Sequence, residues 1–285
     1  PKGKMDAFTL VPDRDGFRQE NLRVINDGLM GIGMSWAPDG RAYFADWIGG
    51  YPLDGKGAIW RFDVAPNVDK TSEKFLSKPF SVSVPKDELL ALLGHRDQRV
   101  RVNASIRLDR LGAWDDMLAL AKKPESNRFA RIHAIWGYGM GLRHGKIADI
   151  EASLSLLEDA DSEIRVQALK VLSETKPTEE LIAKATAQLA HKDFRVRIQA
   201  GLTLGKLGGK VPFVAFLQDA DADLQLPWLR HGLVRGLAGT QSAETLLATA
   251  HTESGAKATF ATLALVRQKS PLLGKLLEHP NPDVV

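Results

Sequence analysis

One short pattern recurs along this chain at nearly regular intervals, and it restricts the possible fold more than any other feature of the sequence. The pattern is an acidic residue, two variable positions, a β-branched residue, an arginine and, further on, an alanine. Three copies match it most closely, Asp97–Ala104, Asp161–Ala168 and Asp193–Ala200. Self-similarity at a fixed period is typical of repeat architectures, so we expect an array of stacked units.

From Lys86 onward the apolar residues follow a helical period. In the best copies they occupy positions i, i+4, i+8 and i+11, which form one apolar stripe on a helix. Examples of this spacing are Val100, Ala104, Leu108 and Leu111, and Val196, Ala200, Leu204 and Leu207. Each copy of the pattern is also preceded by another apolar helix. The alanine is small, which lets the paired helix approach closely. The sequence therefore predicts two-helix units, and these resemble HEAT repeats, although they are shorter than usual.

The equivalent turn residues recur at intervals of 28 to 34 residues. We take them to be Asp97, Asn127, Asp161, Asp193, Asp221, Glu253 and Asn281. In the fifth copy this alignment puts Trp228 in place of the alanine and Pro227 in the first helical turn, where proline is tolerated. The pattern predicts six complete units and a seventh that Val285 cuts short. Because a solenoid needs a capping repeat, we expect this C-terminus to be a truncation.

Residues 1–63 lack the repeat pattern and read as strands. Two short strands are predicted near Phe8–Val11 and Leu22–Ile25. A Pro-Asp-Gly turn after Ala37 separates the runs Ile32–Trp36 and Arg41–Asp46, which indicates a hairpin. A further strand is predicted at Ala58–Phe62. We expect one antiparallel sheet of four strands, which is marginally stable unless a face is covered.

This N-terminal segment resembles the last blade of a β-propeller. The residues that carry the resemblance are Trp36–Trp47, followed by Asp54–Arg61. They are similar to large secreted proteins of planctomycetes and verrucomicrobia that resemble glucose/sorbosone dehydrogenases. The resemblance implies a propeller, then HEAT repeats, then a cytochrome c-like domain. It also implies a periplasmic or secreted location and a parent protein with haem c, pyrroloquinoline quinone or both. Most of the propeller and the haem motif are absent from this sequence.

Composition fits a soluble globular protein and excludes several chemistries. Hydrophobic residues make up 44% and charged residues 26% of the 285 residues, and no apolar run is long enough to span a membrane. Without cysteine the segment has no disulfide, thiolate zinc site, cysteine nucleophile or covalent haem attachment. A net charge of +3 with mixed signs does not point to nucleic acid. The prolines within residues 64–85 indicate a linker between sheet and helices.

The repeated acid and arginine have a structural interpretation. The acid precedes the second helix and can cap its free N–H groups, while the arginine can reach acids of neighbouring units. The residues of this expected Asp–Arg ladder are Asp97, Arg101, Arg131, Asp161, Arg165, Asp193 and Arg197. The alternative is an anion-binding groove, which would need arginines without matching acids.

Two other motifs invite a ligand. Histidine recurs two residues before the turn at four positions, His95, His191, His251 and His279. Stacked helices lie about 8–10 Å apart, too far for these residues to share a zinc ion, so we expect protonated histidines at helix C-termini. Gly137–Gly141 resembles a phosphate loop but follows a helical run rather than a strand. We therefore interpret its glycines as helix-packing positions and the alternating Trp136, Tyr138 and Met140 as packing residues.

The remaining polar candidates lie in the N-terminal segment. Asp46, Trp47 and Asp54 are the positions at which the resemblance would place a substrate or quinone site. The other interpretation of Asp46 is a residue that caps a turn. No complete catalytic constellation is present, so we assign no catalytic residue, metal ligand or cofactor to this segment.

The sequence thus predicts a mostly α fold, a HEAT-like α-solenoid over 86–285 preceded by a small antiparallel sheet within 1–63. The function that fits is a scaffold, with partners among the missing propeller blades, a C-terminal domain, or a protein on the concave face. The alternative is an internal piece of a quinone- or haem-linked sugar dehydrogenase-like oxidoreductase. A cytosolic HEAT regulator is a third reading, against which the aromatic sheet argues.

Overall fold

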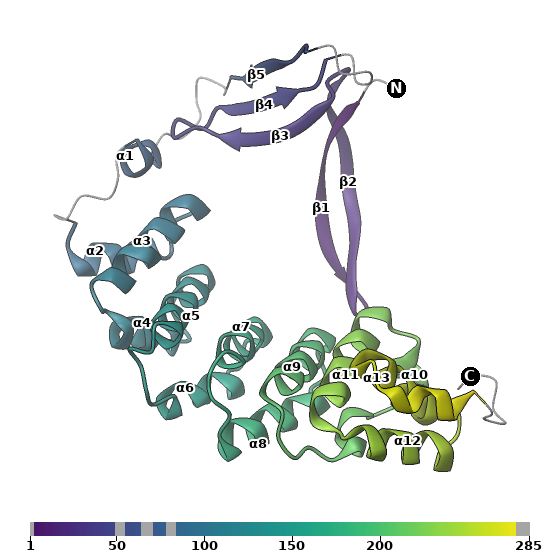
Figure 1. Ribbon diagram of the computed structural model, residues 1–285. Coiled ribbons are helices and arrows are strands. Elements are labelled where there is room, and N and C mark those ends of the chain that lie inside the picture. Colours follow the sequence, from purple (N-terminus) through teal and green to yellow (C-terminus); the bar gives the residue numbers. More distant parts are fainter. Residues whose placement is uncertain (1–2, 49–54, 64–70, 78–83, 278–285) are drawn as a thin grey trace.

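The chain forms an arc of paired helices that faces a β-structure, and the two together outline a ring (Figure 1). The computed structural model describes residues 3–48, 55–63, 71–77 and 84–277. The fold is mostly α, a HEAT-like solenoid preceded by small antiparallel sheets, as the sequence predicts. A long β-hairpin runs from the sheet end of the ring to the far end of the helical arc.

The hairpin consists of β1 (Lys4–Asp13) and β2 (Gly16–Asp27), which pair with no other strand among the described residues. Its last pair is Asp13 with Gly16, so the loop is two residues long, and the first of them, Arg14, has φ of 50°. Such short loops with positive φ fit the right-handed twist of paired strands. Two register irregularities lie near the base, where bulges increase the twist of a ribbon.

The second sheet contains β3 (Gly31–Trp36), β4 (Ala42–Asp46) and β5 (Ala58–Phe62), in that order and antiparallel. The predicted Pro-Asp-Gly turn joins β3 to β4. In it, the N–H of Gly40 donates to the carbonyl of Ala37 over 3.0 Å, and Gly40 has φ of 86°. Glycine adopts this conformation without steric cost, which is why the turn forms here.

The expectation of one four-stranded sheet is wrong. The described residues form five strands in two sheets, because Phe8–Val11 and Leu22–Ile25 extend into a separate ribbon. The missed signal is Asp15-Gly16, a dipeptide typical of tight turns between two runs of strand-forming residues, although the loop itself consists of Arg14 and Asp15. An isolated ribbon is marginal in water, so its stability depends on what its ends contact.

The helices pair as first and second members of each unit. A short α1 (Glu73–Leu76) lies within the predicted linker, and α2 begins at Lys86. The first helices are α2 (Lys86–Leu92), α4 (Trp114–Ala121), α6 (Glu151–Leu154), α8 (Glu179–Ala187) and α12 (Ala243–Thr252). The second helices are α3 (Gln98–Arg110), α5 (Arg128–Arg143), α7 (Ser162–Leu172), α9 (Phe194–Leu207), α11 (Pro227–Thr240) and α13 (Gly255–Gln268). In place of a first helix the fifth unit has the 3₁₀ segment Phe213–Phe216, followed by α10 (Ala220–Leu224).

The predicted apolar stripe forms the core of the arc, except that its last residue in α3, Leu111, is 48% exposed because it lies beyond the end of the helix. Val100, Ala104 and Leu108 of α3 are fully buried, as are the equivalent residues of α9. Burial of a Val or Leu side chain contributes about 1.5–3 kcal/mol, so repetition of this stripe stabilises the whole arc. The second helices line the side of the arc that faces the sheet and hairpin.

The predicted alignment of the fifth and sixth units is wrong. Asp221 lies inside α10, whose cap is Asp219, and Glu253 follows the end of α12 without capping α13. In α11 the buried stripe is Leu229, Leu233 and Leu237, whereas Trp228 is 64% exposed. The extra helix α10 shifts the register, which a search for the repeated acid does not detect. Asn281 lies outside the described residues.

Glycines bring α9 and α11 unusually close. A Cβ on Gly205 would lie 2.4 Å from the carbonyl oxygen of Arg235, and one on Gly201 would lie 2.5 Å from that of Gly232. Neither position can therefore hold a side chain without moving a backbone. This close contact fixes α11, and with it the residues that receive the hairpin tip.

Candidate interaction surfaces

The second helices begin at a row of side-chain caps. In each of the first four units, the residue before the helix accepts a hydrogen bond from the backbone N–H two residues later. The pairs are Asp97 and Arg99, Asn127 and Phe129, Asp161 and Glu163, and Asp193 and Arg195, at 2.8–2.9 Å. Such a cap is worth about 1 kcal/mol to a helix. The repeated acid is thus a helix cap in every unit where the pattern is strongest.

The repeated arginines do not form one continuous ladder with these acids. Arg131 and Arg197 do reach carboxylates of the next unit, Asp159 and Asp223. The pair of Arg197 and Asp223 is bidentate at 2.9 and 2.5 Å, with both residues buried. Arg131 contacts Asp159 and also donates to the carbonyl of Ala121 over 2.8 Å. In these two units an arginine therefore joins neighbouring units through buried charge.

The other two arginines bind carbonyl groups of the preceding turn instead. Arg101 donates to the carbonyls of His95 and Arg96 at 2.7 and 2.9 Å. Arg165 donates to the carbonyl of Asp159 over 2.5 Å and to the side chain of Gln188 over 2.9 Å. The expected ladder is corrected accordingly, because the nearest acceptors for these two guanidinium groups are backbone oxygens.

Of the four recurring histidines, His95 and His191 lie beyond the end of a helix and bond to the turn that follows, and His251 lies in the last turn of α12, where the sequence predicts it. His279 lies outside the described residues. The Nδ1 atoms of His95 and His191 accept hydrogen bonds, both 3.0 Å long, from the N–H of Asp97 and Asp193. Burial, and then the charge of Arg165, lowers the pKa of His191. Within the described ranges, no group of three or more His, Asp or Glu side chains could hold a metal ion.

Helix α11 lacks a cap of its own, and the hairpin supplies one. Leu226 occupies the cap position, three residues before Leu229, the first buried leucine within the helix. Its side chain makes no capping hydrogen bond. The carboxylate of Asp15 accepts from the N–H groups of Trp228 and Leu229 at 2.8 and 3.1 Å. Trp228 is two residues after Leu226, the same offset as in the other units. Asp15 is 9% exposed, so the hairpin tip is seated on the helix.

The hairpin tip also borders a cleft on the inner face of the arc. A Cβ on Gly16 would lie 3.1 Å from the indole ring of Trp228, so the tip lies close against that ring. Phe17 stands beside the guanidinium of Arg195, 5.7 Å from the ring centroid, a cation–π contact. The space between has a volume of about 430 Å³. Sequence reasoning missed this site because it joins residues more than 200 positions apart.

The other end of the arc is attached to the three-stranded sheet. The guanidinium of Arg99 donates to the carbonyls of Trp36 and Ala37 at 3.0 and 2.8 Å. The same side chain hydrogen-bonds to Asp97 and thereby lowers the pKa of that carboxyl to about 2. Arg99 therefore connects the β3–β4 turn to the capped start of α3.

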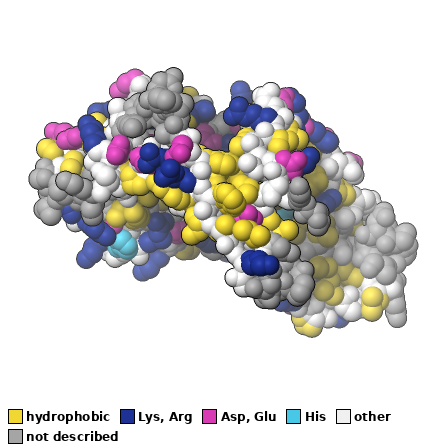
Figure 2. Space-filling view, turned by 90° about the horizontal axis from the view of Figure 1, so that it is seen from above, with side chains coloured by type: hydrophobic (Ala, Val, Ile, Leu, Met, Phe, Trp, Pro, Cys, Tyr) yellow, Lys and Arg dark blue, Asp and Glu magenta, His cyan; other side chains and the backbone are white. Residues whose placement is uncertain are grey.

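One face of the three-stranded sheet carries large apolar side chains that are only partly covered. The cross-strand pairs put Met34, Phe44 and Trp60 on the same face, with Trp36 beside them. Phe44 is buried, but Met34, Trp36 and Trp60 are 59%, 54% and 45% exposed. Seen from the sheet end, hydrophobic side chains gather in the middle of the molecule, between groups of charged residues (Figure 2). Exposed apolar patches on a folded protein indicate interaction sites.

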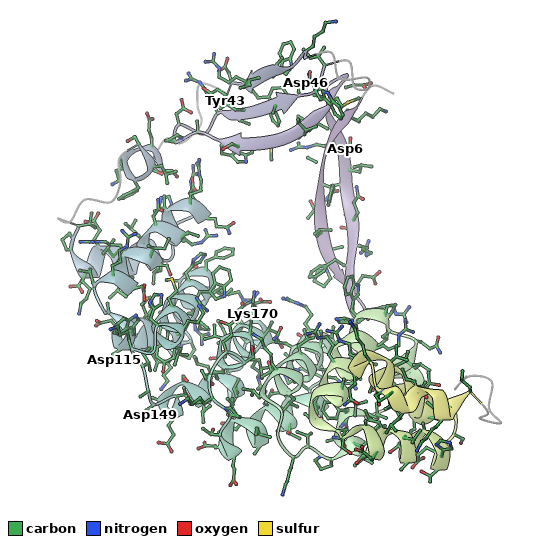
Figure 3. The ribbon with its side chains drawn as sticks, viewed as in Figure 1. Asp6, Tyr43, Asp46, Asp115, Asp149 and Lys170 are labelled. Atoms are coloured by element: carbon green, nitrogen blue, oxygen red, sulfur yellow. The ribbon has the colours of Figure 1, made fainter. Side chains whose placement is uncertain are left out.

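Of the three predicted cofactor residues, Asp46 is used within the sheet. Asp46 lies at the end of β4 (Figure 3). Its two carboxylate oxygens accept from the N–H of Met30 over 2.8 Å and from the indole N–H of Trp60 over 2.9 Å. Trp47 follows β4 directly, and its N–H donates to the carbonyl of Met30. Asp54 lies outside the described residues. A cofactor role for these residues stays a prediction.

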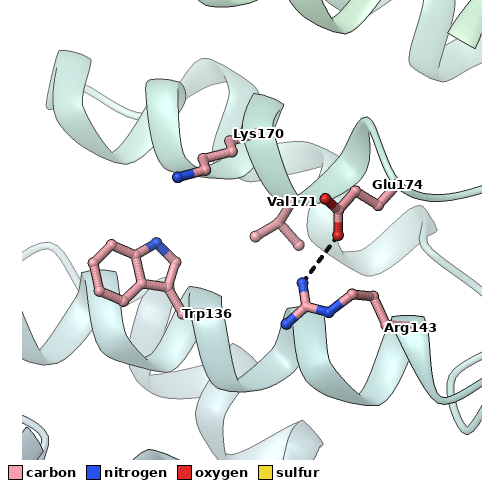
Figure 4. A pocket seen from close by; sticks show the side chains of 5 residues that line it. All are labelled: Trp136, Arg143, Lys170, Val171 and Glu174. Atoms are coloured by element: carbon pink, nitrogen blue, oxygen red, sulfur yellow. Dashed lines mark hydrogen bonds and ion pairs between the residues drawn. The ribbon is translucent and has the colours of Figure 1, made fainter. Parts of the chain in front are cut away.

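A second hollow lies between α5 and α7, with a volume of about 340 Å³ (Figure 4). Trp136 and Lys170 line it, and Arg143 pairs with Glu174 at 3.0 Å along one side. The neighbouring glycines of α5 lie inside the helix and pack closely, as predicted. A Cβ on Gly137 would lie 2.3 Å from the sulfur of Met117.

Comparison with known proteins supports the repeat architecture. Residues 150–238 match the family of HEAT repeats. A search among curated proteins gave no match. In the described part of the chain, every helix is too short or too polar to cross a membrane. The matched segment covers α7, α9 and α11, the three helices that meet the hairpin tip, and it carries a HEAT-repeat solenoid.

Proposed function

We propose that this chain is a scaffold segment of a larger protein, in which the helical arc holds the sheet in a fixed position for assembly with a partner. HEAT solenoids usually mediate protein interactions through such surfaces. The observation that carries the proposal is the double attachment of the β-structure to the arc. Arg99 binds the β3–β4 turn at one end, and Asp15 caps α11 at the other.

Two attachments restrict the sheet more than one does. A β-structure held at a single point can rotate about it, whereas contacts at both ends of the arc close a ring. The face with Met34, Trp36 and Trp60 is then presented in one orientation. Preorganisation of this kind lowers the entropy lost when a partner binds.

The partner that fits this face best is further β-structure, as in a propeller with the sheet as its terminal blade. Support comes from the resemblance of Trp36–Trp47 and Asp54–Arg61 to such a blade and from the exposed apolar face. The parent would then be a periplasmic or secreted protein similar to sugar dehydrogenases, with a haem c or quinone cofactor held outside this segment.

Distance measurements between spin labels test the proposal, since the chain has no native cysteine to interfere. One label replaces the exposed Ala45 on β4 and the other replaces Glu244 on α12. We expect one narrow distance distribution, which broadens when Asp15 and Arg99 are both changed to alanine. A broad distribution in the parent chain would mean that the arc does not fix the sheet.

The alternative function is a piece of a quinone- or haem-linked sugar dehydrogenase. It rests on the same resemblance and on Asp46 at the end of β4. Purified chain incubated with pyrroloquinoline quinone, glucose and a reducible dye distinguishes the two. The scaffold proposal expects no dye reduction above that of quinone alone, whereas turnover lost in Asp46→Asn would favour the enzyme.

A further inference from the structure

The cleft at the hairpin tip is built from residues of four separate elements. Its apolar lining comes from Phe17 of β2, Val166 of α7, Ile198 of α9 and Trp228 of α11. Its volume of about 430 Å³ lies in the range of ligand sites, which are mostly apolar with a few polar groups. Its polar lining residues are Asp15, Arg195 and Gln199.

Both aromatic walls are exposed although they are held in place. Phe17 is 54% and Trp228 is 64% exposed. The backbone N–H of Trp228 is bonded to Asp15, Gly16 packs on the indole, and Phe17 lies beside the Arg195 guanidinium. Rigid, partly exposed aromatic rings that face one space are suited to receive another aromatic ring, because offset or edge contacts between rings are favourable.

Basic side chains outnumber acidic ones on the three helices around the cleft. Across α7, α9 and α11 the sequence contains one acidic residue, Glu163, and it already pairs with Arg195. The remaining acid at the cleft, Asp15, is engaged as the cap of α11. Lys170 lies one turn beyond Val166 on α7 and points to the inside of the arc (Figure 3). Arg235 lies two turns beyond Trp228 on α11 and is exposed.

We propose that this cleft binds an aromatic residue flanked by carboxylates on an extended segment of a partner protein. The aromatic ring enters between Phe17 and Trp228, and the flanking acids extend along the inner face toward Arg235 and toward Lys170, which also lines the hollow between α5 and α7. The proposal rests on the interaction function proposed above and adds a second surface to it, on the inner face of the arc rather than on the sheet. An acidic partner fits because the charges there are complementary to it.

Fluorescence anisotropy with a labelled peptide, Glu-Asp-Phe-Glu-Asp, tests the site. Matched peptides replace the phenylalanine with alanine, or the four acids with lysine. We expect the acidic aromatic peptide to bind at least tenfold more tightly than either control, and the difference to shrink as salt is raised. Equal binding of the lysine peptide, or no binding of the acidic one, would overturn the proposal.

Variants of the protein locate the binding. Trp228→Ala removes one wall while keeping the backbone N–H that Asp15 binds, and Lys170→Glu reverses a charge away from the tip contact. Each variant should lower the affinity for the acidic peptide at least tenfold, whereas the control Val214→Ala, at an exposed position, should leave that affinity unchanged. Unfolding curves of all three verify that the chains fold. Unchanged affinity in both cleft variants would place the peptide elsewhere and contradict the proposal.

Two further measurements separate this site from the scaffold function. Sedimentation of the chain alone shows whether a second copy occupies the cleft, and a dimer that Trp228→Ala dissolves would replace the proposed acidic partner. The spin-label distances report the scaffold independently. A narrow distance distribution together with no peptide binding would refute only the proposed binding site in the cleft. A broad distance distribution would refute the proposed scaffold function.

Discussion

The carboxylate of Asp15 accepts a 2.8 Å hydrogen bond from the backbone N–H of Trp228, a residue 213 positions later in the chain. This contact takes the place of the cap that the repeated aspartate provides in other units. It also closes the ring, since the hairpin has its base at the sheet and its tip on α11 (Figure 1). One hydrogen-bonded carboxylate therefore serves both the helix and the overall arrangement.

Loss of the Asp15 carboxylate should weaken both the cap of α11 and the attachment of the hairpin tip to the arc. Asp15→Ala is expected to lower the free energy of unfolding by about 1 kcal/mol, the typical value of a helix cap. Hydrogen exchange should become faster over residues 227–233 and stay unchanged over 194–200 in α9. Asp15→Asn, which can still accept a hydrogen bond, should behave almost like the parent chain.

Asp13 provides the matched control, because it lies on the same hairpin but is exposed. Asp13→Ala should leave both the unfolding free energy and the exchange of α11 unchanged. If the two alanine variants behave alike, Asp15 does not cap α11.

The buried pair of Arg197 and Asp223 should contribute far more to the free energy of unfolding than the surface pair of Arg128 and Asp161. Arg197→Met leaves a buried carboxylate without its partner, which costs about 3–5 kcal/mol of stability. The double change Arg197→Met with Asp223→Leu should recover most of that loss.

The surface pair is the comparison. Its Arg128 side chain is 62% exposed, so Arg128→Met should cost less than about 1 kcal/mol. Chemical denaturation of the four chains measures the difference. Similar costs for the two single variants would show that burial does not set the strength of these pairs.

The contact between α9 and α11 requires a glycine at position 205. Alanine normally stabilises a helix interior by about 1 kcal/mol relative to glycine. At Gly205 the added Cβ would meet the Arg235 carbonyl at 2.4 Å, so Gly205→Ala should instead destabilise by about 2 kcal/mol or more. Gly274→Ala, where nothing lies within 4 Å, is the control and should be neutral. A stabilised Gly205→Ala would contradict the close approach of the two helices.

Acid should destabilise the chain through His133. Burial, with a smaller effect from the charge of Arg101, lowers the pKa of this residue to about 4, against about 6.5 when unfolded. A base with a lowered pKa in the folded state is neutral there, so its contribution to stability is complete above pH 6.5. That contribution is lost as the pH falls from 6.5 toward 4.

The variant His133→Phe removes the titrating group while keeping a ring beside Trp136. Unfolding free energies measured between pH 7 and 4 should fall less steeply in this variant. Asp97 acts at lower pH, because its pKa is about 2 and its contribution is lost below about pH 4. Parallel curves for the parent and His133→Phe would show that His133 does not titrate between these pH values.

The sequence was sufficient for the parts of the fold that local pattern determines. The stripe of Val100, Ala104 and Leu108, the turn that ends at Gly40 and the caps such as Asp193 all follow from spacing and side-chain chemistry. Each of these features depends on residues within a few positions of one another. They were therefore predicted correctly.

The parts that failed depend on distant residues. No residue near Leu226 in the sequence indicates that Asp15 caps α11. The alignment that took Asp221 as the turn residue also concealed that α11 has no side-chain cap of its own. The repeated arginines were expected to find acids, yet Arg101 lies closer to the carbonyls of its own turn. Both cases are decided by where the chain returns in space, which a local pattern does not contain.

The most direct test of the ring is a cross-link across its closure. Gly16→Cys and Trp228→Cys place the two thiols of an otherwise cysteine-free chain at the hairpin contact. The control pairs Lys4→Cys with Trp228→Cys, because Lys4 is at the other end of a ten-residue strand, about 30 Å away. A short bis-maleimide at low protein concentration should join residues 16 and 228 within one chain and leave the control pair unjoined, as mass spectrometry of the digests would show. If both pairs react alike, or if residues 16 and 228 remain unlinked, the hairpin does not close the ring.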